Sequence, residues 1–484
     1  MLVGGDSVGT VIKDVVFKAN DLRGIVAIPT GEGEDTVVQD RRGEWDEAGA
    51  ARVGQAYAEV AGLEGGTIVI GRDMRVSGEA MSQAFIAGVR SRGVNVRDSG
   101  LSSTDQLWYA SGSLGLHGVQ FTASHNPAEY NGIKFCLPGA APVDGAFLVE
   151  LSRRARELDE ADAPVGEPTG SLEPVDTLSG YVAHLRSLVD TAGLRHLVVV
   201  VDAGNGMAGH TVRAAFEGLD VDLVGLHLEL DGTFPHHPPN PLEPENLVEA
   251  QRAVREHGAD LGLVFDGDAD RCFIIDEHGD VVTPSVVTAL IAAAELAHEP
   301  GATIVVNSVT SGTVEQVVTE LGGRVVTSKV GHTHVKALMA AENAVFGGEH
   351  SAHYYFRDFW GADTGMLAAL HVIAMLGRTD QPMSALVADY QRVSNSGELN
   401  STVVDQQAAL ERAALAFEGK GVADRTDGLT VRGVDAEDRP WWFNLRASNT
   451  EPLLRLNVEA ATDEVMAAIR DDVLDLVRNP SQGV

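Results

Sequence analysis

The chain has 484 residues, 44% of them hydrophobic and 5% aromatic, which suits about three soluble domains of ~150 residues each. Its 36 basic and 70 acidic residues give a net charge of −34, which disfavours nucleic acid and anionic membranes as partners. Two cysteines are too few for a disulfide framework and the first residues show no signal peptide, so we expect a cytoplasmic protein.

A strand, a glycine-bearing turn and a helix recur three times along the chain. The repeats open with the strands TIVIGRD (67–73), LVVVVDAGNG (197–206) and TIVVNSVTSG (303–312). Each is followed by a helical pattern and a second strand. Runs of β-branched residues without alternation are typical of strands buried on both faces of a parallel sheet. Because the repeats lie more than 100 residues apart, they predict tandem α/β domains rather than a solenoid.

The last part of the chain has a different pattern. Strands are predicted over 429–434, 441–448 and 453–460, followed by a helix over 463–477. An apolar stretch near 286–297 is too short and too interrupted to span a bilayer and predicts a buried helix. We therefore expect three similar α/β domains with mixed, mostly parallel sheets and a smaller C-terminal α+β domain, with the bounds 1–169, 170–280, 281–393 and 394–484.

The segment DGDADRC (266–272) carries three alternating carboxylates, Asp266, Asp268 and Asp270, directly after a buried strand. Such carboxylates repel one another unless a cation neutralises them, and hard oxygen ligands suit Mg²⁺ or Ca²⁺. A solvated acidic turn is the alternative. An EF-hand loop is disfavoured, because Arg271 occupies the position that needs glycine and strands flank the loop. Arg271 instead indicates a site that also holds phosphate oxygens.

Two further loops carry hydroxyl and acidic groups. TASHNP (122–127) places Ser124 in a small-residue loop, as a nucleophile or as an ordinary turn residue, and the adjacent His125 is poorly placed to act as its base. GEHSAHYYF (348–356) has Glu349, Ser351 and His353 at alternate positions. On an extended segment these side chains would share one face and could read sugar hydroxyls, or they could be ordinary polar residues of a strand edge.

Three more segments carry basic or polar groups. RASNTEP (446–452) could form a phosphate cradle or a plain β-turn. SKVGHTHVK (328–336) has a His-x-His pair without a third metal ligand nearby. HHPPNP (236–241) raises the same metal possibility, but its prolines favour a rigid loop.

Taken in order, TASHNP, DGDADR, GEHSAH and RASNTEP resemble the signatures of the α-D-phosphohexomutase family, in its phosphomannomutase/phosphoglucomutase branch. FKANDLRG (17–24), GRDMR (71–75) and VVDAGNGMAG (200–209) extend the resemblance over essentially the whole chain. It implies four domains around a central cleft, Mg²⁺ as cofactor and a hexose 1,6-bisphosphate as activator and intermediate. It also implies an isomerase that interconverts hexose 6-phosphate and hexose 1-phosphate, with mannose as the expected sugar and glucose as the alternative.

The resemblance also implies a role for each matching residue. Ser124 would be the phosphoserine, and Asp266, Asp268 and Asp270 would hold Mg²⁺ against its phosphate. Glu349 and Ser351 would contact sugar hydroxyls, and the phosphate that is not reacting would be gripped by Arg446, Ser448, Asn449 and Thr450. The groups around the transferring phosphoryl group or the substrate would be Arg23, Lys134, Arg271, His332 and His353, with Lys134 and His353 as the acid/base candidates.

Some positions depart from the family pattern. Asn20 stands where the family usually has tyrosine, residues 307–312 carry no lysine, and the sugar loop has Ser-Ala-His for Ser-Gly-His. Two other functions remain open at this point: a metal-dependent sugar-phosphate phosphatase using the same phosphoserine, and a non-catalytic carbohydrate- or calcium-binding protein. The expected partners are small hexose phosphates, and the oligomeric state is left open.

Overall fold

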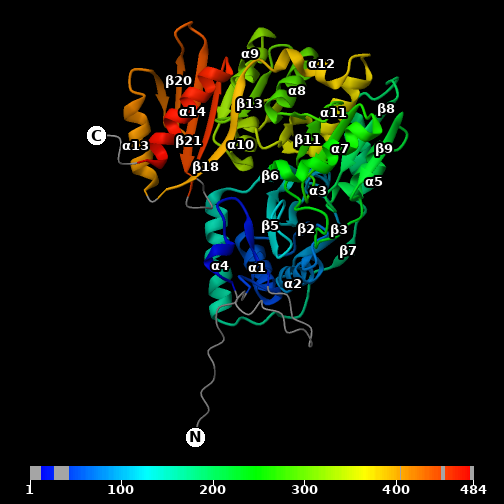
Figure 1. The fold of residues 1–484 in the computed structure, drawn as a ribbon. Helices are drawn as coiled ribbons and strands as arrows, with labels where there is room; N and C mark the ends of the chain where they lie inside the picture. Colours follow the sequence, from blue (N-terminus) through cyan, green and yellow to red (C-terminus); the bar gives the residue numbers. More distant parts are fainter. Residues whose placement is uncertain (1–11, 27–42, 404, 448–452, 480–484) are drawn as a thin grey trace. The chain divides into compact units, whose positions relative to one another are not determined.

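A computed structural model of the chain describes residues 12–26, 43–403, 405–447 and 453–479 (Figure 1). It divides into two compact units. The first holds Met1–Val281 and His353–Met383, and the second holds Val282–Ala352 and Ser384–Val484. Among the helices in these described residues, none has both the length and the apolar character that crossing a membrane requires.

The first unit begins with a mixed sheet in the order β1-β5-β4-β2-β3-β7, with β6 paired to β5. From β4 to β7 neighbouring strands run parallel, whereas β5 runs antiparallel to both β1 and β4. The strands are β1 (Leu22–Ile25), β2 (Thr67–Arg72), β3 (Asn95–Leu101), β4 (His117–Phe121), β5 (Tyr130–Leu137), β6 (Ala141–Pro142) and β7 (Leu172–Pro174). The helices are α1 (Glu47–Val60), α2 (Gly78–Arg90), α3 (Thr104–Leu114) and α4 (Gly145–Glu160). Helix α1 packs against α2 and α4, and their apolar faces share one buried core with the sheet.

A second sheet has the order β12-β11-β10-β8-β9, and apart from Val282, the last residue of β12, it belongs to the first unit. Strands β10, β8 and β9 are parallel, and β11 turns back antiparallel to β10. The strands are β8 (Leu197–Asp202), β9 (Val221–Leu226), β10 (Leu261–Phe265), β11 (Cys272–Ile275) and β12 (Val281–Val282), and the helices of this part are α5 (Leu178–Leu188), α6 (Ala208–Phe216), α7 (Val248–His257) and α11 (Gly365–Gly377). The short strands β16 (Tyr354–Phe356) and β17 (Ala362–Asp363) form an antiparallel pair in the same unit.

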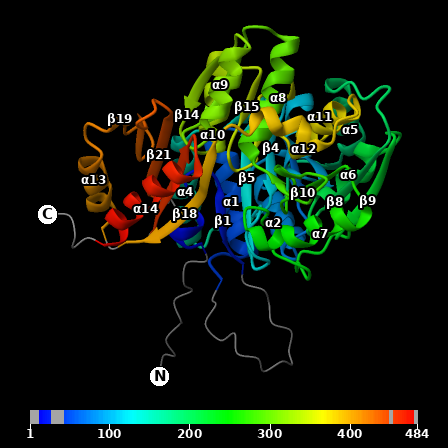
Figure 2. The same ribbon diagram turned by 45° about the horizontal axis from the view of Figure 1, so that its top comes forward.

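The second unit contains three parallel strands in the order β14-β13-β15 and an antiparallel sheet in the order β18-β22-β21-β20-β19. The first group comprises β13 (Thr303–Asn307), β14 (Arg324–Ser328) and β15 (Phe346–Gly348) with α8 (Pro284–His298), α9 (Gly312–Glu320) and α10 (His332–Glu342). The second comprises β18 (Ser394–Thr402), β19 (Gly421–Asp424), β20 (Leu429–Val434), β21 (Pro440–Ala447) and β22 (Leu453–Ala460) with α13 (Gln406–Ala416) and α14 (Asp463–Arg478). Helices α13 and α14 lie side by side and enclose the core of this C-terminal sheet (Figure 2). The short helix α12 (Met383–Val387) lies where the chain passes into this unit for the second time.

The predicted fold class is confirmed: three α/β domains precede a smaller C-terminal α+β domain. Each predicted strand–helix–strand repeat is present, and the non-alternating strands β8, β10 and β13 are buried almost throughout. The apolar stretch near 286–297 is the buried helix α8. Strand β18, at the start of the predicted C-terminal domain, is an element that the sequence pattern did not predict.

Candidate active site

The loop between β4 and β5 carries Ser124, which is 2% exposed and has φ of 51°. This left-handed conformation is uncommon for a residue other than glycine and is costly unless the surroundings enforce it. The guanidinium of Arg75 does so, because it donates to the carbonyl oxygens of Ser124 (2.9 Å), Asn126 (2.7 Å), Pro127 (2.7 Å) and Tyr130 (2.9 Å). The serine loop is therefore fixed by one buried side chain.

Sequence reasoning gave Arg75 no role of its own. It follows β2, and β2 pairs in parallel with β4, so the end of β2 lies beside the start of the serine loop. The carboxylate of Asp73 accepts hydrogen bonds from both the backbone N–H and Nε of Arg75. The only signal in the sequence was the position of GRDMR directly after a strand, because backbone carbonyls as partners leave no trace in residue types.

The second loop, between β10 and β11, carries Asp266, Asp268 and Asp270, all of which are buried. It meets the serine loop at Gly267, where an added Cβ would lie 2.5 Å from the carbonyl oxygen of Ser124. Only glycine allows that approach. Because Gly267 has no side chain, the DGDAD loop can pack directly against the serine loop, which brings the carboxylates close to Ser124.

The hydroxyl of Ser124 points at the carboxylates. Its Oγ donates to Oδ2 of Asp266 at 2.9 Å and accepts from Nη2 of Arg271 at 3.2 Å. Arg271 also donates through Nε to the same Asp266 oxygen at 2.9 Å, and it contacts Nδ1 of His125. The predicted proximity of serine, aspartates and arginine is present in the structure.

Two cations face the three carboxylates. The ammonium of Lys134, on β5, lies 2.7 Å from Oδ2 of Asp268 and 2.5 Å from Oδ2 of Asp270. Thr104 adds a hydroxyl donor to Asp268 at 2.5 Å. With Lys134 and Arg271 opposing three ionised carboxylates, the cluster keeps one surplus negative charge inside the protein. A proton or a further cation must offset it, because a buried unpaired charge is costly.

The pKa values follow this arrangement. Burial raises the pKa of Asp266 to about 7, against the attraction of Arg271. Burial also opposes ionisation of Asp268, but the ammonium of Lys134 outweighs it and holds the pKa of Asp268 below its usual range. Burial and the nearby charge of Arg271 keep the pKa of His125 well below its ordinary value, so this ring stays neutral.

The carboxylates fit a hard divalent cation. One oxygen from each of Asp266, Asp268 and Asp270 lies within 4.8 Å of the others. The Oδ1 atoms of Asp268 and Asp270 are buried and accept no hydrogen bond. Buried carboxylate oxygens normally have a partner, and oxygen-only donors select Mg²⁺ or Ca²⁺ over softer metals. The donor set therefore suits a metal such as Mg²⁺.

Two more predicted residues of the first unit lie around these loops. Arg23 donates to Oδ1 of Asn126 in the serine loop at 3.0 Å and pairs with Asp21 at 2.8 Å. Nε2 of His353 lies 3.6 Å from Oδ1 of Asp270, and the backbone of His353 forms a bridge with Arg271. Both side chains are thus close to the groups that hold the serine and the carboxylates.

The segment 348–356 was predicted to contact sugar hydroxyls from an extended conformation. Its residues up to Ala352 belong to the second unit, and the extended conformation is wrong. Residues 349–352 form a turn, closed by the N–H of Ala352 donating to the carbonyl oxygen of Glu349, and Ala352 has φ of 66°. The chain here is not extended, so Glu349, Ser351 and His353 do not share a strand face. Oε1 of Glu349 instead accepts from Nδ2 of Asn307 at 2.9 Å and from the N–H of Gly331 at 3.3 Å.

The remaining predicted residues lie in the same unit. His332 begins helix α10, directly after Gly331, so its loop is tied to that of Glu349. Arg446, at the end of β21, is 8% exposed and donates to Oε2 of Glu398 at 3.1 Å. Ser448, Asn449 and Thr450 lie outside the residues that the structure describes.

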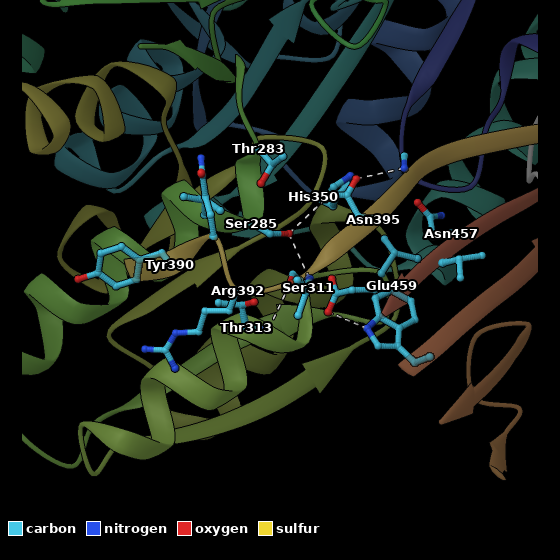
Figure 3. Close-up of a pocket in the computed structure, with 17 residues that line it drawn as sticks. Thr283, Ser285, Ser311, Thr313, His350, Tyr390, Arg392, Asn395, Asn457 and Glu459 are labelled. Carbon is cyan, nitrogen blue, oxygen red and sulfur yellow. Dashed lines mark hydrogen bonds between the residues drawn. The ribbon is translucent and has the colours of Figure 1, made fainter. Parts of the chain in front are cut away.

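The second unit also has a pocket of about 320 Å³, lined by the first residues of α8 and α9 and by strands β18, β21 and β22 of its C-terminal sheet (Figure 3). In it, Glu459 accepts from the N–H of Gly312 at 2.9 Å and from Nε1 of Trp442 at 3.1 Å, while Ser285 lies 3.1 Å from Nδ1 of His350. Within the described part of the chain, no site residue predicted from the sequence lines this pocket.

Four models of one protein family match the chain. They are described as phosphoglucomutase/phosphomannomutase, with alpha/beta/alpha domain I matching residues 14–162, domain II residues 179–279, domain III residues 283–393, and the C-terminal domain residues 398–476.

Similar proteins are matched over their full length. The phosphomannomutase of Salmonella montevideo is 39% identical over 472 residues, which cover 96% of this chain and 99% of that protein. A Xanthomonas campestris pv. campestris protein named "Phosphohexose mutases" is 38% identical, with the same coverage. The crystal structure of a phosphoglucomutase/phosphomannomutase family protein from Burkholderia thailandensis matches with a TM-score of 0.83 and 31% identity, over 98% of this chain and 99% of that one.

These matches agree with the resemblance carried by the four motifs, and they span all four domains. Together with the serine and the three carboxylates that the fold brings to one place, they identify the family. The chain belongs to the phosphoglucomutase/phosphomannomutase family of phosphohexomutases.

Proposed function

We propose that this enzyme interconverts hexose 6-phosphate and hexose 1-phosphate through a phosphoserine at Ser124 and a hexose 1,6-bisphosphate. One observation carries the proposal: Ser124 Oγ lies 2.9 Å from Asp266, beside two further buried carboxylates and Arg271. Such a site suits holding a phosphoryl group between a cation and an arginine. The names of the relatives support mannose phosphate as the sugar, with glucose phosphate as a second substrate.

The phosphoryl group would be carried on Oγ of Ser124. The P–Oγ bond breaks as the free hydroxyl oxygen of a hexose monophosphate attacks phosphorus and gives up its proton. The bisphosphate then reorients in the site, and Oγ attacks the phosphorus of its other phosphoryl group. The bond from that phosphorus to the second hexose oxygen breaks, and this oxygen regains a proton as the hydroxyl of the product. When bound at Asp266, Asp268 and Asp270, Mg²⁺ would draw negative charge from the phosphoryl oxygens.

The side chains around the serine suit this sequence of steps. Arg271 donates to Oγ and is placed to stabilise charge on the phosphoryl oxygens, and Arg23 is held at the same loop by its hydrogen bond to Asn126. Burial opposes the charge of Lys134, but the carboxylates of Asp268 and Asp270 outweigh it and raise the pKa of Lys134 above its usual value, so this side chain is an ammonium that can donate hydrogen bonds to phosphoryl oxygens. We assign it as the candidate acid. His353, beside Asp270, is the candidate proton acceptor.

The second unit would supply substrate recognition. We assign Glu349, Ser351 and His332 to the sugar hydroxyls, since the loops of Glu349 and His332 are joined by a hydrogen bond. Arg446, with Ser448, Asn449 and Thr450, is assigned to the phosphate that is not reacting.

The test is an assay of mannose 1-phosphate and glucose 1-phosphate with Mg²⁺ and glucose 1,6-bisphosphate. Ser124→Ala should lower kcat for both sugars by about 10³-fold or more, because it removes the phosphate carrier. Intact-mass measurement should find a phosphoryl group on the parent protein and none on this variant. Ser113→Ala, at an exposed serine of α3, is the matched control and should keep full activity. Full activity of Ser124→Ala would disprove the proposal, and release of inorganic phosphate without isomer formation would indicate a phosphatase.

A further inference from the structure

A second group of metal-binding side chains lies in the first unit, at the carboxyl ends of β8 and β9. Asp202 ends β8, His227 directly follows β9, and His237 comes from the loop 231–241. Strands β8 and β9 are parallel neighbours with Asp202 opposite Leu226, so the first two side chains start from the same edge of the sheet. Each of the three residues offers one ligand atom, and these atoms lie within 4.8 Å of one another.

The two ring nitrogens of His237 have different partners, and Nε2 faces the buried carboxylate of Asp202. Its Nδ1 lies 2.9 Å from the carbonyl oxygen of Pro238, which can only accept, so Nδ1 carries the proton. In the neutral ring Nε2 is then an acceptor, and it lies 3.1 Å from Oδ2 of Asp202, a second acceptor. Two acceptors at this distance require a proton or a metal ion between them.

The spacing suits a metal ion. Zinc binds imidazole nitrogen and carboxylate oxygen at about 2.0–2.1 Å, which places neighbouring ligand atoms of a tetrahedral site about 3.3 Å apart. The 3.1 Å between Nε2 of His237 and Oδ2 of Asp202 is close to that edge. Two imidazoles and one carboxylate also differ in kind from the oxygen-only group beside Ser124, and they favour a transition metal over Mg²⁺.

The surrounding groups hold the three side chains in place. The other oxygen of Asp202 accepts from the N–H of Gly204 at 2.9 Å. Nε2 of His227 lies 3.1 Å from Oε2 of Glu249, and its ring stacks on that of His236 with centroids 3.8 Å apart. His227 also has φ of 50°, a conformation that is uncommon outside glycine and that collects at functional sites. Ligands of metals are normally oriented by such outer contacts.

We propose that Asp202, His227 and His237 bind a divalent transition ion of the zinc type, which ties the ends of β8 and β9 to the loop 231–241. The site is separate from the catalytic carboxylates but adjoins them through this loop. Pro239, two residues after His237, packs against Gly267 of the aspartate loop, where an added Cβ would lie 3.4 Å from the proline ring. The bound ion would therefore brace the loop on which the catalytic aspartates rest.

The test is a titration of the full chain with Zn²⁺ and with Co²⁺ in excess Mg²⁺. It is carried out in an Asp268→Asn background, which weakens metal uptake by the catalytic carboxylates. We expect one equivalent to bind, with the visible absorption of tetrahedral Co²⁺. Zn²⁺ should release a proton, detected by calorimetry in two buffers of different ionisation enthalpy. His237→Ala and His227→Gln should each weaken binding by about 100-fold or more.

His196→Ala is the matched control, because His196 lies in the same domain, 2.9 Å from Asp220 and 3.5 Å from Asp222, but is half exposed. It should leave Co²⁺ binding unchanged. Circular dichroism in EDTA shows whether each variant is folded. If His237→Ala does not fold, the result for His227→Gln decides the test. Unchanged binding by His227→Gln, loss of binding in His196→Ala, or no stoichiometric uptake by the parent protein would overturn the proposal. The contact between His237 and Asp202 would then be an ion pair between a protonated imidazole and a carboxylate, with the structural role of fixing the loop 231–241.

Discussion

Lys134 is the residue on which the charge balance of the aspartate cluster depends. It is 5% exposed and is within hydrogen-bond distance of both Asp268 and Asp270. Without it, two buried carboxylates lose their counter-charge, and breaking a buried ion pair from one side costs about 3–5 kcal/mol. We predict that Lys134→Met lowers the free energy of unfolding by about this amount in EDTA, measured by urea denaturation, and that Mg²⁺ recovers part of the loss.

The exposed Lys13 of the same domain gives the control for this variant. Lys13→Met should change the free energy of unfolding by less than about 0.5 kcal/mol, as surface substitutions usually do. Equal losses in the two variants, or a loss in Lys134→Met that Mg²⁺ does not reduce, would contradict the assigned role of Lys134 as counter-charge to the aspartates.

Asp105 is a buried carboxyl group outside the reaction, and it gives a pH dependence of stability. It accepts hydrogen bonds from Tyr181 (2.6 Å) and Thr364 (2.7 Å), but burial raises its pKa from 3.8 to about 6. Since the folded pKa is the higher one, ionisation opposes folding. The contribution of Asp105 is complete below its unfolded pKa and is lost as pH rises from about 4 to about 6, by about 3 kcal/mol.

Comparison with Asp105→Asn isolates this contribution, because asparagine does not titrate. The free energy of unfolding of the parent protein minus that of Asp105→Asn should fall by about 3 kcal/mol between pH 4 and pH 6 and stay level above it. Urea denaturation at several pH values measures the difference. A difference that is independent of pH would show that folding leaves the pKa of Asp105 unchanged, and one that rises with pH would show that folding lowers it; either result would contradict the prediction.

Individual residues of the site could be predicted where they belong to one sequence motif. They could not be predicted where only the fold brings them together. The alternating aspartates and the serine loop could be recognised because their residue types and spacing are distinctive, and the structure brings Ser124 to Asp266. Arg75 could not be recognised, since its partners are carbonyl oxygens that any residue supplies. The same holds for Asp105, whose neighbours Tyr181 and Thr364 come from distant parts of the chain.

Among the helices, α1 and α2 cross closely because each provides a glycine at the contact. A Cβ on Gly54 of α1 would lie 2.4 Å from the carbonyl oxygen of Phe85, and one on Gly88 of α2 would lie 2.1 Å from that of Ala51. Neither carbonyl can move without displacing its helix. Gly88→Ala should therefore lower the free energy of unfolding by about 1–3 kcal/mol, although alanine is the better helix former.

Gly145→Ala is the control for this prediction. Gly145 begins helix α4, and an added Cβ there would meet no atom within 4 Å. This substitution should be neutral or stabilise the protein by up to about 1 kcal/mol. Denaturation of both variants in urea gives the comparison, and a stabilising effect of Gly88→Ala would disprove the close packing of α1 on α2.

At this scale the sequence predicted elements well wherever their pattern is periodic or continuous. The strands and helices of the three repeats lie where the apolar runs placed them, since a strand buried on both faces needs such a run. Strand β18 was missed because its residues, SNSGELNST, are mostly polar and its stability depends on pairing with β22. The turn at 349–352 was missed because polar residues at alternate positions are compatible with a strand as well as with a turn.

For the molecule as a whole, the division into two compact units predicts how it unfolds. The chain passes between the units at residues 281–282, 352–353 and 383–384, and each unit contains a buried hydrophobic cluster of its own, within residues 12–158 in the first and 409–477 in the second. Units with separate cores tend to unfold in separate transitions. All three carboxylates of the proposed magnesium site lie in the first unit, so the metal should stabilise that unit alone.

We therefore predict two transitions in scanning calorimetry, of which Mg²⁺ raises only one. At a concentration 100 times its Kd, Mg²⁺ should add about 2.7 kcal/mol to the free energy of unfolding of the first unit, because it binds only the folded state. Gly88→Ala identifies this transition by lowering its midpoint, and Asp268→Asn should abolish its response to Mg²⁺. If Mg²⁺ moved both transitions together, or moved the one that Gly88→Ala leaves unchanged, the metal would be bound by residues of the second unit as well, and the assignment of the cation to the three aspartates would be wrong.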